Sequence, residues 1–237
     1  MKHLIETTDL NSLPKVLYDR LILDSTKNEI VYRGGVNTNG HSYVDLGLPS
    51  GLKWAKCNVG ATSETDYGDY FMWGSTTPNT ADECNWSKAP FNNGSDSYNE
   101  GYFNAHKSEW LDSKNNLKPE FDAARAIMKG DWRMPTKAEW QELLNNTNKE
   151  WTQVNGVNGY KFTSKKEGYQ NNSIFIPAAG YCDVGSVYNV GNNGNVWSSS
   201  LNASNPDGAW GLGFDSGNCY MGYGNRYYGL SVRGVRN

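Results

Sequence analysis

The pattern of apolar and polar positions divides the chain into a short N-terminal region and a longer region rich in strand signals. The stretch LILDSTKNEIVYRGG (21–35) places two apolar runs around a polar turn, which predicts a β-hairpin. A Ser-x-Pro sequence at 12–14 predicts the start of a short helix. The stretch GVNTNGHS (35–42) is typical of a linker. We therefore expect a boundary between residues 1–42 and a main domain at 43–237.

Short strand patterns dominate the main domain. The stretch YVDLGLPSGLKWAKCNVGA (43–61) predicts two strands joined by a turn at Pro49–Gly51. In AWGLGFDS (209–216) apolar residues occupy alternate positions, so we expect Trp210, Leu212 and Phe214 to face the core and the residues between them to face solvent. Further strand patterns are GYKFTS, SIFIPAAGY, NVWSSS and LSVRGVR.

Two helices are predicted between these strands. The stretch PEFDAARAIMKG (119–130) has apolar residues at helical spacing, and its Gly130 is placed to end a helix. Thr136 and Glu139 form a capping-box pattern that opens the helix KAEWQELLNN (137–146). Residues 75–118 are polar and indicate a long irregular insertion. Helices embedded among short strands indicate an α+β domain. The apolar faces consist of Phe121, Ala124, Ile127 and Met128 in the first helix and Trp140, Leu143 and Leu144 in the second.

Charge and terminal composition exclude several classes of protein. The 237 residues carry a formal net charge of −3 and show no clustered basic face, so we expect no nucleic-acid partner. No stretch approaches the roughly 18 apolar residues of a membrane span, so we expect no membrane insertion. The N-terminus shows no signal-peptide pattern. We therefore expect the protein to be made in the cytoplasm and released by another route, such as cell lysis.

Residues capable of catalysis or metal binding are scattered along the chain. The four cysteines lie far apart with no CxxC spacing, and the three histidines show no metal-binding spacing. Asn205-Pro206-Asp207 resembles half of a sugar-binding calcium loop, but the other half is missing and a turn is the simpler interpretation. We therefore expect no catalytic residue, no metal and no cofactor. The residues concerned are Cys57, Cys84, Cys182, Cys219, His3, His41 and His106.

Three arginines lie within these motifs. Arg133 and Arg233 are framed by apolar or aromatic residues, so we predict that both are buried members of ion pairs. Arg226 lies in the tyrosine-rich C-terminal stretch. It is predicted either to support a loop or to reach a ligand.

Several motifs occur in a fixed order along the main domain: YVDLGLPSGLKWAKCNVGA, YGDYFMWG, DWRMPTKAEWQEL, IFIPAAGY, VWSSS and RYYGLSVRGVR. Together they resemble the Fibrobacter-type major paralogous domain of gut bacteria and their phages. The resemblance runs from about Tyr43 to the C-terminus and implies a C-type-lectin-like fold, in the variant shared with formylglycine-generating enzymes. Those enzymes use two cysteines near the C-terminus, but neither Cys182 nor Cys219 lies in a stretch like their catalytic motif. An enzyme of that type is therefore the least favoured alternative.

Some members of that family are diversified by a retroelement that rewrites the C-terminal segment at template adenines. The resemblance therefore implies a variable region at about residues 192–228. Randomised asparagine codons cannot produce Lys, Glu, Gln, Met or Trp, and the positions between the fixed residues contain none of these. The insert GNCYMGYGNRYYG would be exposed between anchors at Met221, Arg226 and Gly229, and LSVRGVRN would lock the chain end into a sheet. The predicted ligand-binding residues are Trp210, Gly211, Gly213, Asp215, Cys219, Tyr220, Gly222, Tyr223, Gly224, Asn225, Tyr227 and Tyr228.

These features favour a binding protein that displays a diversified surface on a rigid scaffold, as in a phage tail or a cell-surface adhesin. Tyrosine and glycine are also enriched in binding loops. The implied partner is a surface protein or glycan of a bacterial or host cell, met at a virion surface or outside the cell. The alternatives are a structural protein with a fixed surface and a carbohydrate-binding module of the same fold.

The N-terminal region has two interpretations. Residues 1–42 resemble the attachment hairpins of phage tail-fibre proteins, and such a segment would join the chain into a homotrimer. Alternatively, they form an N-terminal hairpin of the main domain.

Overall fold

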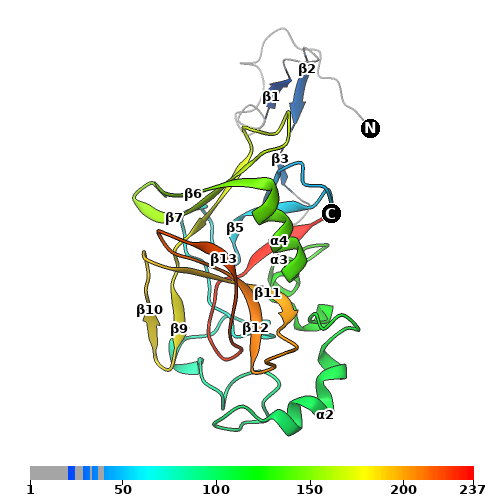
Figure 1. Ribbon diagram of the computed structural model, residues 1–237, viewed down its shortest axis with the longest axis vertical. Coiled ribbons are helices and arrows are strands. Elements are labelled where there is room, and N and C mark those ends of the chain that lie inside the picture. Colours follow the sequence, from blue (N-terminus) through cyan, green and yellow to red (C-terminus); the bar gives the residue numbers. More distant parts are fainter. Residues whose placement is uncertain (1–20, 25–28, 33, 37–39) are drawn as a thin grey trace.

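The computed structural model describes residues 21–24, 29–32, 34–36 and 40–237 (Figure 1). These residues form a few helices and several small antiparallel sheets, which confirms the predicted α+β class. Strands β1 (Leu21–Asp24) and β2 (Glu29–Tyr32) pair antiparallel and confirm the predicted hairpin. The helix start predicted at 12–14 lies outside the described residues.

The first and last strands of the main domain meet in one four-stranded antiparallel sheet. Its order is β14 (Arg233–Arg236), β5 (Lys53–Asn58), β4 (Ser42–Asp45) and β3 (Gly34–Val36). The C-terminal stretch is therefore a sheet strand, as predicted. The linker prediction for 35–42 is wrong at both ends, because β3 and β4 pair there. Because β3 pairs with the side of β4 that faces away from β5, it satisfies main-chain groups that would otherwise be exposed at a sheet edge.

Three further sheets occur in the described region. The first consists of β6 (Thr147–Val154), β7 (Val157–Ser164) and β8 (Ser173–Pro177). The second is the hairpin of β9 (Tyr181–Asp183) and β10 (Ser186–Tyr188), and the third consists of β11 (Gly194–Leu201), β12 (Gly208–Phe214) and β13 (Cys219–Asn225). The predicted strands correspond to β7, β8, β11 and β12. β6 and β10 lacked a signal because most of their residues are at least partly exposed. β13, predicted as an exposed insert, pairs with β12 along its whole length.

Helix α4 (Lys137–Asn146) has the predicted capping box and buried face. The Glu139 N–H donates to Thr136 Oγ1 at 3.3 Å, and the Thr136 N–H donates to the Glu139 carboxylate at 2.8 Å. Its buried residues are Trp140, Leu143 and Leu144.

The helix predicted at 119–130 is divided in two. A 3-10 turn at Pro119–Phe121 precedes α3 (Ala123–Met128). The carboxylate of Asp122 accepts hydrogen bonds from the N–H groups of Arg125 and Met134, so Asp122 caps a new helix instead of continuing the first. No helix in the described part of the chain is both long and apolar enough to cross a membrane.

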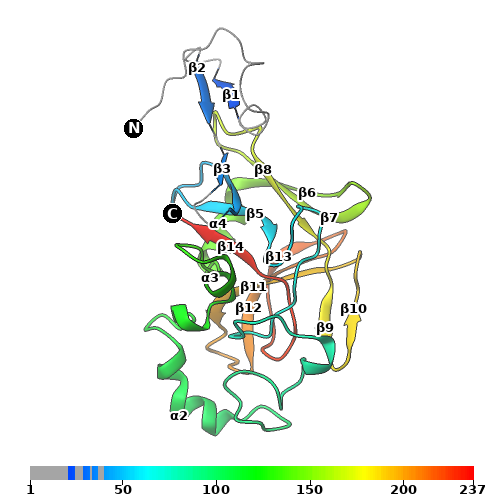
Figure 2. The same cartoon turned by 180° about the vertical axis from the view of Figure 1, so that it is seen from behind.

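The polar insertion is more regular than the sequence predicts. It contains a 3-10 turn (Ala81–Glu83) and helix α2 (Glu100–Trp110), which lies at the opposite end of the molecule from β3 (Figure 2). The helix was missed because it buries only Phe103 and Trp110. The buried Asn92 organises the preceding loop: its amide nitrogen donates to three carbonyls, and its oxygen accepts from the N–H at the N-cap of α2.

Buried main-chain carbonyls pair with side-chain N–H groups throughout the core. The indole of Trp73 donates to the carbonyl of Ser198 at 2.9 Å, and the indole of Trp197 donates to that of Phe71 at 2.8 Å. The Trp140 indole donates to the Trp197 carbonyl at 3.3 Å. These bonds hold β11 against the 71–73 segment on one side and α4 on the other.

Arg233 also donates hydrogen bonds to buried oxygen atoms, at the point where β14, β5 and β8 meet. Its guanidinium is fully buried and donates to Asn58 Oδ1 and to the carbonyls of Ala55 and Phe175 at 2.8–3.0 Å. The predicted ion pair is wrong for Arg233, because the acceptors that the structure describes are neutral oxygens. Burial lowers the pKa of Arg233 to about 10, so the group stays charged at neutral pH.

Arg133 forms the ion pair that was predicted for it, but its side chain is partly exposed and not buried as expected. Its guanidinium makes two hydrogen bonds to the Glu139 carboxylate, at 2.8 and 2.5 Å. The pair connects the segment before α4 to the first turn of that helix.

We predict that Arg233→Ala lowers the free energy of unfolding by about 3 kcal/mol or more, because three buried acceptors lose their donor. Lys56→Ala, an exposed position on β5, is the control and should change stability by less than about 0.5 kcal/mol. Urea titration of both variants measures the difference. Equal effects would contradict the role assigned to Arg233.

Candidate functional site

One face of the sheet β11–β12–β13 carries a groove of about 420 Å³. The register of β12 and β13 pairs Gly211 with Gly222 and Gly213 with Tyr220, and paired residues share a face. Gly224, two residues beyond Gly222, lies on the same face. The groove floor therefore includes main chain at four glycines, which add no side chains of their own.

Tyrosine rings surround this floor. A Cβ atom at Gly213 or Gly222 would meet the Tyr220 ring at 3.6 or 3.2 Å, so this ring lies across both positions. A Cβ atom at Gly224 would meet the Tyr228 ring at 3.3 Å. Tyr220 is 55% exposed, which leaves most of its ring available to a ligand.

None of the described side chains that line the groove is charged at neutral pH. Their polar groups are phenol hydroxyls, the Asn195 amide and the indole of Trp210. Burial raises the pKa of the Tyr181 phenol, so its hydroxyl stays protonated and can donate a hydrogen bond. A groove of this chemistry suits an uncharged ligand held by ring contacts and hydrogen bonds.

The aromatic surface continues from the groove onto the hairpin β9–β10. The Tyr181 ring lies 5.4 Å from that of Tyr228 and is stacked 5.6 Å from that of Tyr188. Val187 and Tyr188 on this hairpin are 44% and 43% exposed. Exposed apolar side chains on adjacent elements are typical of an interaction surface.

The groove brings together eight of the predicted binding residues and leaves four outside. Those that line it are Trp210, Gly211, Gly213, Tyr220, Gly222, Tyr223, Gly224 and Tyr228. Those outside it are Asp215, Cys219, Asn225 and Tyr227.

Asp215 and Cys219 have evident structural roles. Asp215 Oδ1 accepts hydrogen bonds from the N–H groups of Gly217 and Asn218 at 2.8 and 2.9 Å, which shapes the turn between β12 and β13. Cys219 lies on the face opposite the groove, where it packs with Met221 against the core. Burial raises the pKa of its thiol to about 12.

Asn225 and Tyr227 lie beyond the groove. The Asn225 carbonyl accepts the Tyr228 N–H at 2.9 Å and turns the chain at the end of β13. The Tyr227 ring packs 5.1 Å from that of Trp86 in the insertion.

Six further lining residues were not predicted to bind a ligand: Tyr181, Asn195, Trp197, Leu212, Met221 and Leu230. Trp197 pairs with Gly211, so its position follows from the register of β11 on β12. A register shift between Trp197 and Leu201 ends this regular pairing, and the sequence pattern does not reveal it.

Trp210 is only partly on the core side of β12. Leu212 and Phe214 are buried as predicted, but Trp210 is half-buried and lies between the groove and a larger open cavity of about 1070 Å³. The amine of Lys137 lies 3.1 Å from the centre of the Trp210 ring, a cation–π contact that covers one ring face.

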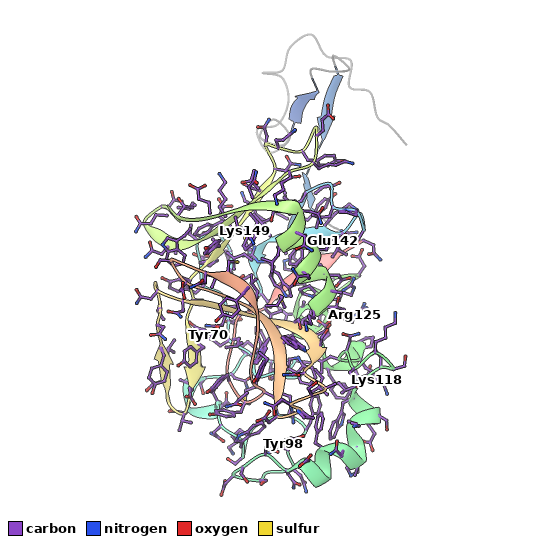
Figure 3. All side chains as sticks on the ribbon, in the orientation of Figure 1. Tyr70, Tyr98, Lys118, Arg125, Glu142 and Lys149 are labelled. Atoms are coloured by element: carbon purple, nitrogen blue, oxygen red, sulfur yellow. The ribbon has the colours of Figure 1, made fainter. Side chains whose placement is uncertain are left out.

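Arg226 supports the end of β13 and is fully buried. Its Nε donates to the Pro206 carbonyl at 2.8 Å, and its guanidinium lies 4.1 Å from the ring centre of Phe103 and 5.4 Å from that of Tyr98. Figure 3 shows Tyr98 close to α2. Burial lowers the pKa of Arg226 to about 10. Of the two predicted roles, the structure places Arg226 in the supporting one.

The calcium half-loop at 205–207 forms a turn. The Gly208 N–H donates to the Asn205 carbonyl at 2.9 Å, and the Asp207 carbonyl accepts from the Arg226 N–H at 2.9 Å. In the part of the chain that the structure describes, no three His, Cys, Asp or Glu residues gather in a way that could hold a metal ion.

The floor glycines differ in the space around them. A Cβ atom at Gly211 would lie 2.7 Å from the Val196 carbonyl oxygen, whereas one at Gly213 would meet only the Tyr220 ring at 3.6 Å or more. We predict that Gly211→Ala lowers the free energy of unfolding by about 1–3 kcal/mol through overpacking. Gly213→Ala should leave it unchanged or raise it by up to about 1 kcal/mol. Thermal and urea unfolding of both variants measure the two changes in the free energy of unfolding. Equal destabilisation by the two substitutions would contradict the difference in space around Gly211 and Gly213.

Comparison of the chain with protein families, with curated protein sequences and with solved structures finds no match.

Proposed function

We propose that this protein binds an uncharged ligand in the groove of sheet β11–β12–β13 and performs no catalysis there. The observation that carries the proposal is the glycine floor enclosed by partly exposed tyrosines. Tyrosine offers a large amphipathic contact area at a small cost in conformational entropy. Glycines leave room for a ligand to approach the main chain.

The sequence resemblance extends the proposal to a diversified surface on a C-type-lectin-like scaffold. The space around the floor glycines supports a diversified surface. At Gly213 and Gly222 a larger side chain meets only the Tyr220 ring, which can move, so these positions can vary. Met221 and Arg226, expected to be fixed anchors, pack against the core or are buried. The partner is a surface protein or glycan of a bacterial or host cell, and the protein serves as a phage-tail or cell-surface adhesin.

We predict that Gly213→Leu weakens ligand binding at least about tenfold, because its side chain would fill groove volume that a ligand needs. The probes are a printed array of neutral glycans and intact gut bacterial cells, with bound protein measured by fluorescence. Gly101→Leu, on the exposed face of α2, is the matched control and should bind as the unmodified protein does. Unchanged binding by Gly213→Leu, at unchanged stability, would refute a ligand site in the groove.

Diversification makes a separate prediction about the gene. DNA beside it should carry a near-identical copy of its 3′ end, differing at adenines, next to a reverse-transcriptase gene. Among sister copies, codon changes should fall at residues 213, 220, 222 and 223 and spare Gly211 and Arg226, whose surroundings leave no space for other side chains. Sequencing the locus tests this. Differences at other bases, or none, would exclude the diversified binder and favour the fixed-surface alternative.

A further inference from the structure

β13 is the outer strand of its sheet and pairs with β12 along one side only. At one end of this pair the Asp215 N–H donates to the Asn218 carbonyl, and at the other the Arg226 N–H donates to the Asp207 carbonyl. Hydrogen-bonded and non-bonded pairs alternate along an antiparallel ladder. Both terminal hydrogen bonds place the hydrogen-bonded pairs at the same residues of β13, namely at every second residue counted from Asn218 or from Arg226.

Two sets of main-chain groups follow from this alternation. Tyr220 and Gly222 direct their N–H and C=O groups toward β12, whereas Cys219, Met221 and Tyr223 direct theirs away from the sheet. Within the described residues, no main-chain group pairs with the outward set of these three residues.

The outer side of β13 also lacks the usual protection of an edge strand. Proteins commonly guard such edges with lysine, proline or a bulge. The β13 sequence CYMGYGN contains no lysine and no proline, and its pairing with β12 shows no register shift, so the strand has no bulge. An edge with free hydrogen-bonding groups and no such guard can accept another strand.

We propose that β13 binds an extended, uncharged peptide segment of a partner protein as an added strand. This inference rests on the proposed ligand-binding function of the groove and specifies how a protein ligand is held. Main-chain hydrogen bonds provide affinity in this mode, and pockets for alternate side chains provide specificity.

The groove suits the side chains of such a segment. An added strand lies about 4.8 Å from its neighbour, and its alternate residues point to the groove face. Gly222 and Gly224 add no side chain of their own on this face, so a long apolar or aromatic side chain of the added strand can pack against the neighbouring rings of Tyr220 and Tyr228. Because the described lining carries no charge, a charged side chain would lose its hydration without gaining a counter-charge.

A second copy of this chain fits less well as the occupant. On the groove face a second β13 offers one tyrosine and two glycines, which leave most of the 420 Å³ unfilled. A stable interface uses about 20–30 residues on each side, whereas β13 supplies 7.

The matched variants Tyr223→Ala and Tyr223→Pro test the added strand. Both remove the tyrosine ring, but only proline removes the outward N–H, and proline is tolerated on edge strands. The probe is a random twelve-residue peptide library displayed on phage and selected against the whole protein, from which one enriched peptide is synthesised. We expect Tyr223→Pro to bind this peptide about tenfold more weakly than Tyr223→Ala, since it lacks a main-chain hydrogen bond and adds steric bulk at the edge.

A second measurement uses the unmodified protein, so it does not depend on how the proline variant folds. N-methylation of the peptide, one position at a time, should weaken binding at every second position only, because alternate N–H groups face β13. Absence of any enriched peptide, uniform losses along it, or equal affinity of the two Tyr223 variants would overturn the proposal. A dimer in sedimentation that Tyr223→Pro abolishes would also overturn it, in favour of a second copy.

The two proposals fail separately. If Gly213→Leu weakens glycan or cell binding while Tyr223→Pro matches Tyr223→Ala, the groove function stands and the added strand does not. If the N-methyl pattern has a period of two but Gly213→Leu changes nothing, β13 binds peptides without the groove.

Discussion

The pairing of buried main-chain carbonyls with indole and guanidinium N–H groups holds this fold together. Its strands are short and many of its connections are irregular, so carbonyls that a longer sheet would satisfy end up in the interior. An unpaired buried carbonyl costs about 1–3 kcal/mol. Trp73, Trp140 and Trp197 meet this demand around β11, and Arg233 meets it where β14, β5 and β8 converge. These three tryptophans therefore serve both as apolar bulk and as hydrogen-bond donors.

This framework positions the candidate binding surface. Trp197 belongs to the hydrogen-bonded framework and to the candidate binding surface. Its indole donates to the Phe71 carbonyl in the core, and its side chain lines the groove. Arg226 continues the same chemistry at the end of β13, where it bonds the Pro206 carbonyl and packs among rings of the insertion. The insertion, which includes helix α2, thereby supports the strand that carries Tyr220 and Tyr223.

The surroundings of the glycines in the C-terminal sheet show which positions have space for a larger side chain and which do not. Gly211 is confined by the Val196 carbonyl, whereas Gly213 and Gly222 border only a tyrosine ring. Cys219 has a residue type compatible with randomised codons, yet its thiol packs against the core. Codon compatibility and exposure are therefore separate criteria. Only positions that meet both, such as Tyr220 and Tyr223, belong to a surface that could be diversified without loss of stability.

Local signals in the sequence determined the α+β class, the capping box at Thr136 and Glu139, and the alternation of Leu212 and Phe214. These features depend on neighbours within a few positions, where spacing alone specifies which side chains share a face. Tertiary structure alone decided that 219–225 is a strand, that Cys219 faces inward and that Arg233 binds neutral carbonyls. It also brought Tyr181 and Trp197 to the groove. Each of these depends on strand register and on partners distant in the chain, and a one-residue change of register would exchange the two faces of β13.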